Sequence, residues 1–285
     1  YALVALGFVL IYKASGIFNY AQGVMALFAA LTLVGIMDGQ VPFSHLINAI
    51  LGTEVHHFGW HVPAFLAILL TMVVMIVLAY CVQRFVFRYL VGQEPIILFM
   101  ATIDLAYFLE GVGDLMWGSE IKTLDVGLPQ GINVWIDEFT FEATGYGFFI
   151  DNLDIVASIV AAILVIGLVM FAQYTKQGRA MRAVADDHQA ALSVGVSLNF
   201  IWILVWSLAG FVALVAGIMW GAKSGVQFSL SLIALKALPV LMLGGFTSIP
   251  GAIVGGLIIG VGEKLFEFLI GAPFLGGATE HWFAY

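Results

Sequence analysis

The sequence predicts an all-α protein, a polytopic bundle of about eight helices that cross a membrane. Two observations carry this prediction. Of the 285 residues, 62% are hydrophobic and only 10% are charged, whereas a soluble domain has about 25% charged residues. The hydrophobic residues also gather into runs near the ~20 residues that a spanning helix needs. We therefore expect a single transmembrane domain over residues 1–285, and the net charge of −8 argues against a nucleic-acid partner.

Each expected helix is a hydrophobic run between polar breaks. The runs cover about 1–12, 24–37, 62–82, 96–117, 155–172 and 200–222, and a hydrophobic last third follows over 230–270. Residues 243–256, LGGFTSIPGAIVGG, interrupt that last third. Their glycines have the spacing that lets helices pack closely, and together with the proline they also suit a broken or re-entrant helix. The segment therefore serves either helix packing or contact with a substrate. Because the first run is too short to span and the last residues resemble the start of another helix, we expect incomplete termini.

The basic residues indicate how the chain is oriented. Six of the ten bases fall on alternate connections between the runs: Lys13, Arg84, Arg88, Lys176, Arg179 and Arg182. The connections 38–61 and 118–153 hold only one base, Lys122. Since Lys and Arg favour cytoplasmic loops, we expect residues 173–199 in the cytoplasm and the two base-poor connections on the outer side.

A basic, polar stretch over 173–195 separates two of the expected spans. Asp186, followed three positions later by Gln189, is typical of a capping box, whose side chains bond the free N–H groups at a helix start. Gly195 is a typical helix stop. We therefore expect a short helix over about 187–194 that lies outside the membrane. Its one apolar face would consist of Ala190, Ala191 and Val194.

Acidic residues in the fourth run form a polar stripe. At 100° per residue, four side chains fall within a sector about 120° wide: Asp104, Tyr107, Glu110 and Asp114. Ionisable groups inside a membrane usually face water or the interior of a bundle. The stripe therefore either lines a transport path or joins helices in a buried network. Lys236 lies in another hydrophobic run and needs a carboxylate or carbonyl partner, unless its long side chain reaches an interface.

The sequence contains no motif for nucleotide chemistry or catalysis. A phosphate loop of the form Gly-x-x-x-x-Gly-Lys-Ser/Thr does not occur. A Ser/His/Asp or Cys/His nucleophile set is not apparent either. We therefore expect no enzymatic activity in the chain, no cofactor and no metal ion.

Four stretches together carry a family resemblance: NYAQG over 19–23, TKQGRAMRA over 175–183, QAALSVG over 189–195 and LGGFTSIPGA over 243–252. In this combination the chain resembles the integral permeases of bacterial branched-chain amino acid ABC importers. Those permeases carry an Asn-aromatic-Ala-His/Gln-Gly signature, a Thr-x-x-Gly-Arg-Ala run and a Glu-Ala-Ala-x-x-x-Gly loop. Gln189 stands where that loop has Glu.

The resemblance implies a transmembrane importer subunit in the bacterial inner membrane that moves branched-chain amino acids or a related small polar solute. Besides the lipid bilayer, it implies three kinds of partner: a second homologous permease, two cytoplasmic ATPase subunits that hydrolyse ATP, and a periplasmic binding protein. The alternative is an autonomous ion-coupled carrier or channel that uses the stripe of Asp104, Glu110 and Asp114.

The resemblance also assigns roles to particular residues. The short loop helix becomes a coupling helix that docks into the ATPase. The residues implied in ATPase coupling are Arg179, Arg182, Asp186, Asp187, Gln189, Ala190, Ala191 and Gly195. The candidate pathway residues are Asn19, Gln22, Asp104, Tyr107, Glu110 and Lys236.

Overall fold

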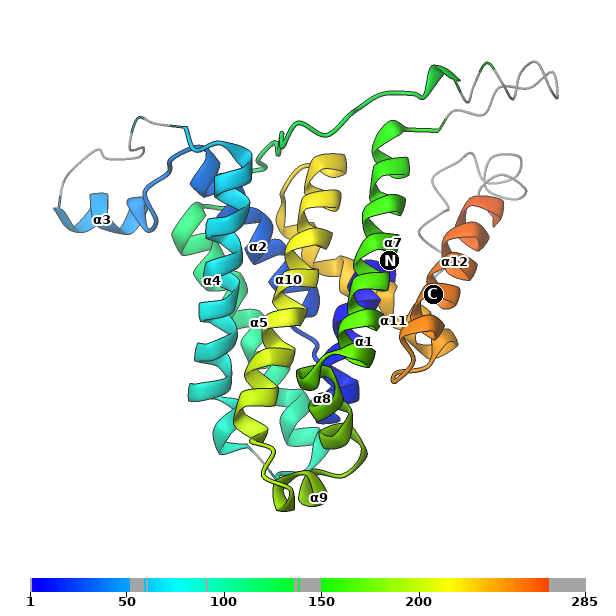
Figure 1. The fold of residues 1–285 in the computed structure, drawn as a ribbon. Coiled ribbons are helices and arrows are strands. Elements are labelled where there is room, and N and C mark those ends of the chain that lie inside the picture. Colours follow the sequence, from blue (N-terminus) through cyan, green and yellow to red (C-terminus); the bar gives the residue numbers. More distant parts are fainter. Residues whose placement is uncertain are drawn as a thin grey trace.

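The computed structural model describes residues 2–51, 61–90, 92–135 and 150–266, together with residues 59 and 138. This part contains helices and two isolated β-bridges but no strand, which confirms the all-α fold (Figure 1). The elements are α1 Ala2–Ser15, α2 Gln22–Met37, α3 Ser44–Leu51, α4 Ala64–Phe85, η1 Phe87–Tyr89, α5 Pro95–Trp117, α7 Asn152–Tyr174, α8 Lys176–Asp186, α9 His188–Ser193, α10 Leu198–Ser224, η2 Phe228–Leu232, α11 Ile233–Gly244 and α12 Ile249–Phe266.

The predicted hydrophobic runs all appear as helices. Among the described residues, five helices are long and apolar enough to cross a membrane: α4, α5, α7, α10 and α12. Three shorter apolar segments accompany them, at α1, at α2 and over η2–α11. The prediction of about eight spans therefore corresponds to five full-length helices and three shorter segments that do not reach spanning length.

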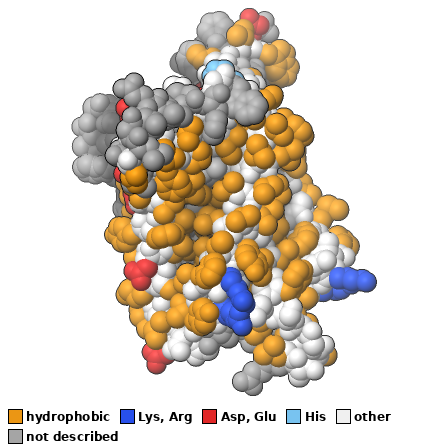
Figure 2. All heavy atoms as spheres, turned by 90° about the vertical axis from the view of Figure 1, so that its left-hand side faces the viewer, with side chains coloured by type: hydrophobic (Ala, Val, Ile, Leu, Met, Phe, Trp, Pro, Cys, Tyr) orange, Lys and Arg blue, Asp and Glu red, His pale blue; other side chains and the backbone are white. Residues whose placement is uncertain are grey.

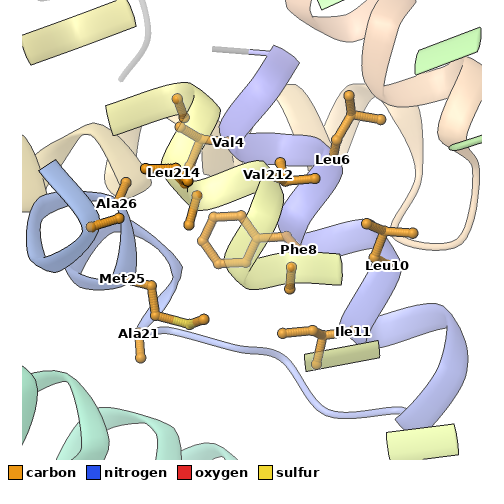
Figure 3. Close-up of a cluster of buried hydrophobic side chains, with 14 of the residues drawn as sticks. Val4, Leu6, Phe8, Leu10, Ile11, Ala21, Met25, Ala26, Val212 and Leu214 are labelled. Carbon is orange, nitrogen blue, oxygen red and sulfur yellow. The ribbon is translucent and has the colours of Figure 1, made fainter. Parts of the chain in front are cut away.

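Helix α10 lies at the centre of the bundle, where it contacts α1, α2 and α4. In the most apolar 18-residue stretch of α10, 67% of the residues are buried, against 17% in that of α7. Helix α7 therefore presents most of its surface to the surroundings. Close approach explains the central position: a Cβ on Gly217 would lie only 2.5 Å from the carbonyl oxygen of Ala26 in α2. Figure 3 shows Phe8 of α1 packed in the same cluster as Met25 of α2 and Val212 of α10.

The glycine-rich last third packs two helices against each other. Helix α11 contacts α12 closely, and a Cβ on Gly244 would lie 2.1 Å from the carbonyl oxygen of Gly251. A Cβ on Gly255 would lie 2.4 Å from the carbonyl oxygen of Val240. The close packing of two helices that the sequence suggested here is confirmed, and the hydrophobic run is also interrupted, because α11 ends at Gly244 and α12 begins at Ile249.

The connections that carry six of the ten basic residues lie at one end of the bundle, which we call the basic end. Helices α4 and α7 both finish there, and α8 and α9 lie there, at the bottom of Figure 1. The end of α5 and the connection that follows it lie at the opposite end. Figure 2 shows blue basic side chains near the basic end of one face, below a wide hydrophobic region. This arrangement matches the alternation of bases along the sequence.

Candidate functional site

The segment at the basic end begins with a sharp corner between α7 and α8. Thr175 caps α8, because its Oγ1 accepts a hydrogen bond from the N–H of Gly178 (2.9 Å) and donates one to the carbonyl oxygen of Phe171 (2.7 Å). A Cβ on Gly178 would lie 2.3 Å from that same carbonyl oxygen. The Thr-x-x-Gly spacing is therefore what folds α8 back against the end of α7.

Helix α8 turns one face toward the bundle. Met181 and Val184 are buried, and α8 contacts α1, α7 and α10.

The two arginines of α8 differ in exposure. Arg179 is exposed and donates to the carbonyl oxygen of Tyr174 (3.4 Å). Arg182 is partly buried, and its Nε has no hydrogen-bond acceptor among the described residues. The sequence prediction missed this helix, although the Thr175 cap and the three-residue spacing of Met181 and Val184 could have found it.

The short helix α9, His188–Ser193, lies within the predicted range 187–194, but its N-cap was assigned to the wrong residue. Asp186 is the last residue of α8, and Asp187 is the cap: its Oδ1 accepts from the N–H of Ala190 (3.1 Å). Either aspartate could accept a hydrogen bond from a free N–H at the start of α9. The choice between them therefore depends on the residue at which α8 ends. The side chain of Gln189 lies outside the described part of the structure.

The predicted stop at Gly195 is confirmed. Gly195 has φ +85°, a conformation that favours glycine. Its N–H bonds the carbonyl oxygen of Leu192 (3.0 Å), and the N–H of Val196 bonds that of Ala191 (3.0 Å). These two bonds form the Schellman motif that satisfies carbonyl groups at a helix end.

The predicted apolar face of α9 is wrong in one respect. Ala191 is only 2% exposed and belongs to the hydrophobic core, so it attaches α9 to the rest of the chain. Ala190 is exposed, and so are Leu192 (52%) and Val194 (80%). Ala191 therefore cannot be part of an outward docking face, and the outward apolar residues are Ala190, Leu192 and Val194.

Two predicted pathway residues, Asn19 and Gln22, are completely buried. Gln22 Nε2 donates to the carbonyl oxygen of Ala209 (3.2 Å), near the middle of α10, and Asn19 Nδ2 donates to Gln22 Oε1 (3.2 Å). Helix α2 therefore begins inside the bundle rather than at its basic end. The structure gives the pair a packing role where α2 meets α10, and a role in a pathway stays a prediction.

The connection from α1 to α2, residues 16–21, is irregular backbone inside the bundle. Such backbone needs hydrogen-bond partners at membrane depth. Asn19 Oδ1 accepts from the N–H of Ala21 (3.1 Å), and Thr102 Oγ1 of α5 accepts from the N–H of Tyr20 (3.0 Å). Thr102 was missed from the sequence, because nothing local to α5 indicates that it meets a segment 82 residues earlier.

The acidic stripe of α5 faces away from the chain. Asp104, Tyr107 and Asp114 are exposed, and Glu110 is partly buried. The interpretation of the stripe as a buried network within this chain is therefore wrong, since three of its four side chains are on the surface. Lys236 of α11 is partly buried.

These features define a class of protein. A multi-pass membrane protein has these features: repeated apolar spans, basic residues at one end and a capped, exposed helix at that same end. A model of the family described as "Branched-chain amino acid transport system / permease component" matches residues 1–284, and the chain belongs to that family. It is thus a transmembrane subunit of an ABC importer, a type of system that also has ATPase and binding-protein partners.

Curated relatives agree with this placement. The chain is 29% identical over 273 residues to a high-affinity branched-chain amino acid transport system permease protein, BraD, from Pseudomonas aeruginosa, covering 92% of this chain and 80% of that protein. It is 28% identical over 278 residues to the protein LivH of the same description from Escherichia coli K12, covering 93% and 81%. A fructose import permease protein, FruG, from Bifidobacterium longum is 23% identical over 280 residues, covering 92% and 76%. No solved structure matches the chain.

Proposed function

We propose that this chain is one of two homologous permeases in an importer that moves branched-chain amino acids or a related small polar solute. Two cytoplasmic ATPase subunits hydrolyse the ATP, and a periplasmic binding protein delivers the solute. BraD and LivH are branched-chain amino acid permeases, which supports the choice of solute. The similarity to a fructose permease supports the wider class, because related permeases differ in what they carry.

One observation carries the proposal: α9 is exposed at the basic end yet anchored in the core. Its outward residues Ala190, Leu192 and Val194 suit a cleft of an ATPase, whereas Ala191 faces inward. Helix α9 packs on α8, and α8 contacts α1, α7 and α10. A partner that pushes α9 therefore moves α8, and α8 transmits the displacement to three helices of the bundle.

The remaining coupling residues shape this element. Asp187 and Gly195 fix its two ends, as the cap and the stop described above. Arg179 is exposed on the side of α8, where it is available for acidic groups of an ATPase. Arg182, Asp186 and Gln189 stay candidates for ATPase contact through the family resemblance alone.

The acidic stripe supports a second permease. A carboxylate that faces lipid at membrane depth is costly. The exposed Asp104 and its neighbours Tyr107 and Glu110 therefore need to contact another protein or water. A second permease placed against α5, with a hydrated path between the two chains, supplies it. Lys236 is then a candidate for lining that path, and the buried Asn19 and Gln22 support it through the contact between α2 and α10. An autonomous carrier would also use the stripe, but it has no use for an exposed helix like α9.

Neighbouring alanines in α9 provide the test. Ala190→Trp adds bulk to the outward face, and we expect ATPase co-purification to fall about tenfold, the scale of a clash in a close-packed contact. Ala191→Trp adds the same bulk inside, and we expect it to destabilise the chain itself by roughly 1–3 kcal/mol. Co-purification and thermal unfolding of the detergent-solubilised complex measure the two effects separately.

The two variants, Ala190→Trp and Ala191→Trp, together distinguish docking from simple attachment of α9 to the membrane surface. A helix that only lies on lipid tolerates Ala190→Trp, since Trp favours interfaces. Full recovery of the ATPase subunits with Ala190→Trp, together with normal ATP hydrolysis stimulated by the binding protein, would eliminate the docking role of α9.

A further inference from the structure

A short segment after α5 crosses the end of the bundle opposite to α9. We call residues 118–126 the strap. It begins at Gly118, whose φ of +80° ends α5 with a sharp turn. Figure 1 shows the chain leaving α5 at this end and running across to the top of α10. In the proposed orientation this is the outer side, where a binding protein approaches.

The strap is fastened to α10 through its backbone. Lys122 and Val226 form an antiparallel bridge, with N–H to oxygen distances of 3.0 Å and 2.7 Å in the two directions. Val226 follows α10 by two residues and is fully buried. Leu124 is buried as well, and its Cδ2 lies 3.0 Å from the position that a Cβ on Gly221 of α10 would take. The middle of the strap is therefore part of the packed structure.

The side chain of Lys122 fastens the strap to two more helices. Its Nζ donates to Gln40 Oε1 (2.5 Å), three residues beyond the end of α2, and to the carbonyl oxygen of Trp117 (2.7 Å), the last residue of α5. Trp117 in turn packs against Gly35 of α2, where a Cβ would lie 2.1 Å from the indole. One lysine thus holds together the outer ends of α2, α5 and the strap.

A charged side chain is unfavourable at the position of Lys122, which is partly buried and lies in an outer connection. Burial lowers the pKa of Lys122, while the nearby charges of Asp38 and Glu120 act in the opposite direction. A methionine would avoid that cost of burying an ammonium group. Lysine is also the type of residue that outer connections avoid. Its hydrogen bonds to Gln40 and Trp117 are the feature that accounts for a lysine at this position.

We propose that the strap is the element through which the binding protein acts on the permease, and that Lys122 is the positioning residue that makes it effective. The exposed strap residues Glu120 and Asp125, and the turn at Gly127 that follows the strap, are open to a partner on the outer side. A push on it reaches the ends of α2, α5 and α10 together, because all three are tied at Lys122. The inference rests on the proposed function, since it needs a binding protein and an ATPase.

The test removes the tie without removing the bulk. Lys122→Met keeps an unbranched side chain that is only one atom shorter, but it loses both donated hydrogen bonds. We expect binding-protein stimulation of ATP hydrolysis in proteoliposomes to fall about tenfold or more, the scale of one lost charged hydrogen bond. Basal hydrolysis and ATPase co-purification should stay at the wild-type level, because α9 is untouched.

Lys223 offers a matched control at the same end. It pairs with Asp154, and both side chains are about half exposed, so this ion pair contributes little. Lys223→Met should leave stimulation unchanged. Gln40→Leu, which removes the other partner, should reproduce the loss, and Lys122→Arg should restore part of it.

Two results would overturn the proposal. One is wild-type stimulation in both Lys122→Met and Gln40→Leu. The other is an equal fall of basal and stimulated hydrolysis, which would reduce Lys122 to a residue that only stabilises the fold. Failure of the proposed function looks different, because the wild-type chain would then recover no ATPase at all.

Discussion

At the scale of single residues, the contact between α2 and α10 depends on a glycine of α1 as much as on the side-chain amides of Asn19 and Gln22. A Cβ on Gly7 of α1 would lie 2.0 Å from Gln22 Nε2 and 2.4 Å from its Cδ. Gln22 can donate to Ala209 only because α1 leaves this space. The NYAQG signature therefore works together with a glycine that lies twelve residues before it.

Gly7→Ala tests this arrangement. The added methyl group must displace the Gln22 side chain and break its hydrogen bond, so we expect a loss of roughly 1–3 kcal/mol in stability. Gly111→Ala is the control, because Gly111 lies in α5 with open space around it, and alanine favours a helix. Thermal unfolding in detergent compares the two. Equal stability of both variants would mean that Gln22 does not need its observed position.

At the scale of elements, the corrected cap of α9 leads to a distinct prediction. Asp187→Ala removes the side chain that accepts from the N–H of Ala190, and a lost N-cap costs about 1 kcal/mol. Amide hydrogen exchange within α9 should then accelerate roughly fivefold. Asp186→Ala should leave it unchanged, since Asp186 ends α8. Faster exchange in Asp186→Ala than in Asp187→Ala would contradict the assignment of Asp187 as the cap.

The elements also show how far the sequence alone could predict the site. Gly195 and the range of α9 were predictable, because a stop and a short helix depend on local backbone geometry. The choice between Asp186 and Asp187 was not, since it depends on where α8 ends. The direction of Ala191 was not predictable either, because it depends on how α8 packs on α1, α7 and α10.

At the scale of the whole molecule, composition and the spacing of bases were enough for the all-α bundle and for the shared basic end. Hydrophobic runs predict helices directly, because each spanning helix must satisfy its own backbone. The α5 stripe shows the limit. Its position on one helix face follows from periodicity, but whether that face is buried or exposed depends on which helices lie beside it.

The proposed function requires the whole assembly, since we propose that the chain imports solute only as a subunit driven by separate ATPases. Uptake of labelled leucine into proteoliposomes tests it most directly. The chain is reconstituted with its partner subunits, with the binding protein outside and ATP enclosed inside, and in parallel without the ATPases. We predict accumulation only when ATPases, enclosed ATP and binding protein are all present. Accumulation by the chain without ATPases, driven by an ion gradient, would rule out an ATPase-driven subunit and favour an autonomous carrier.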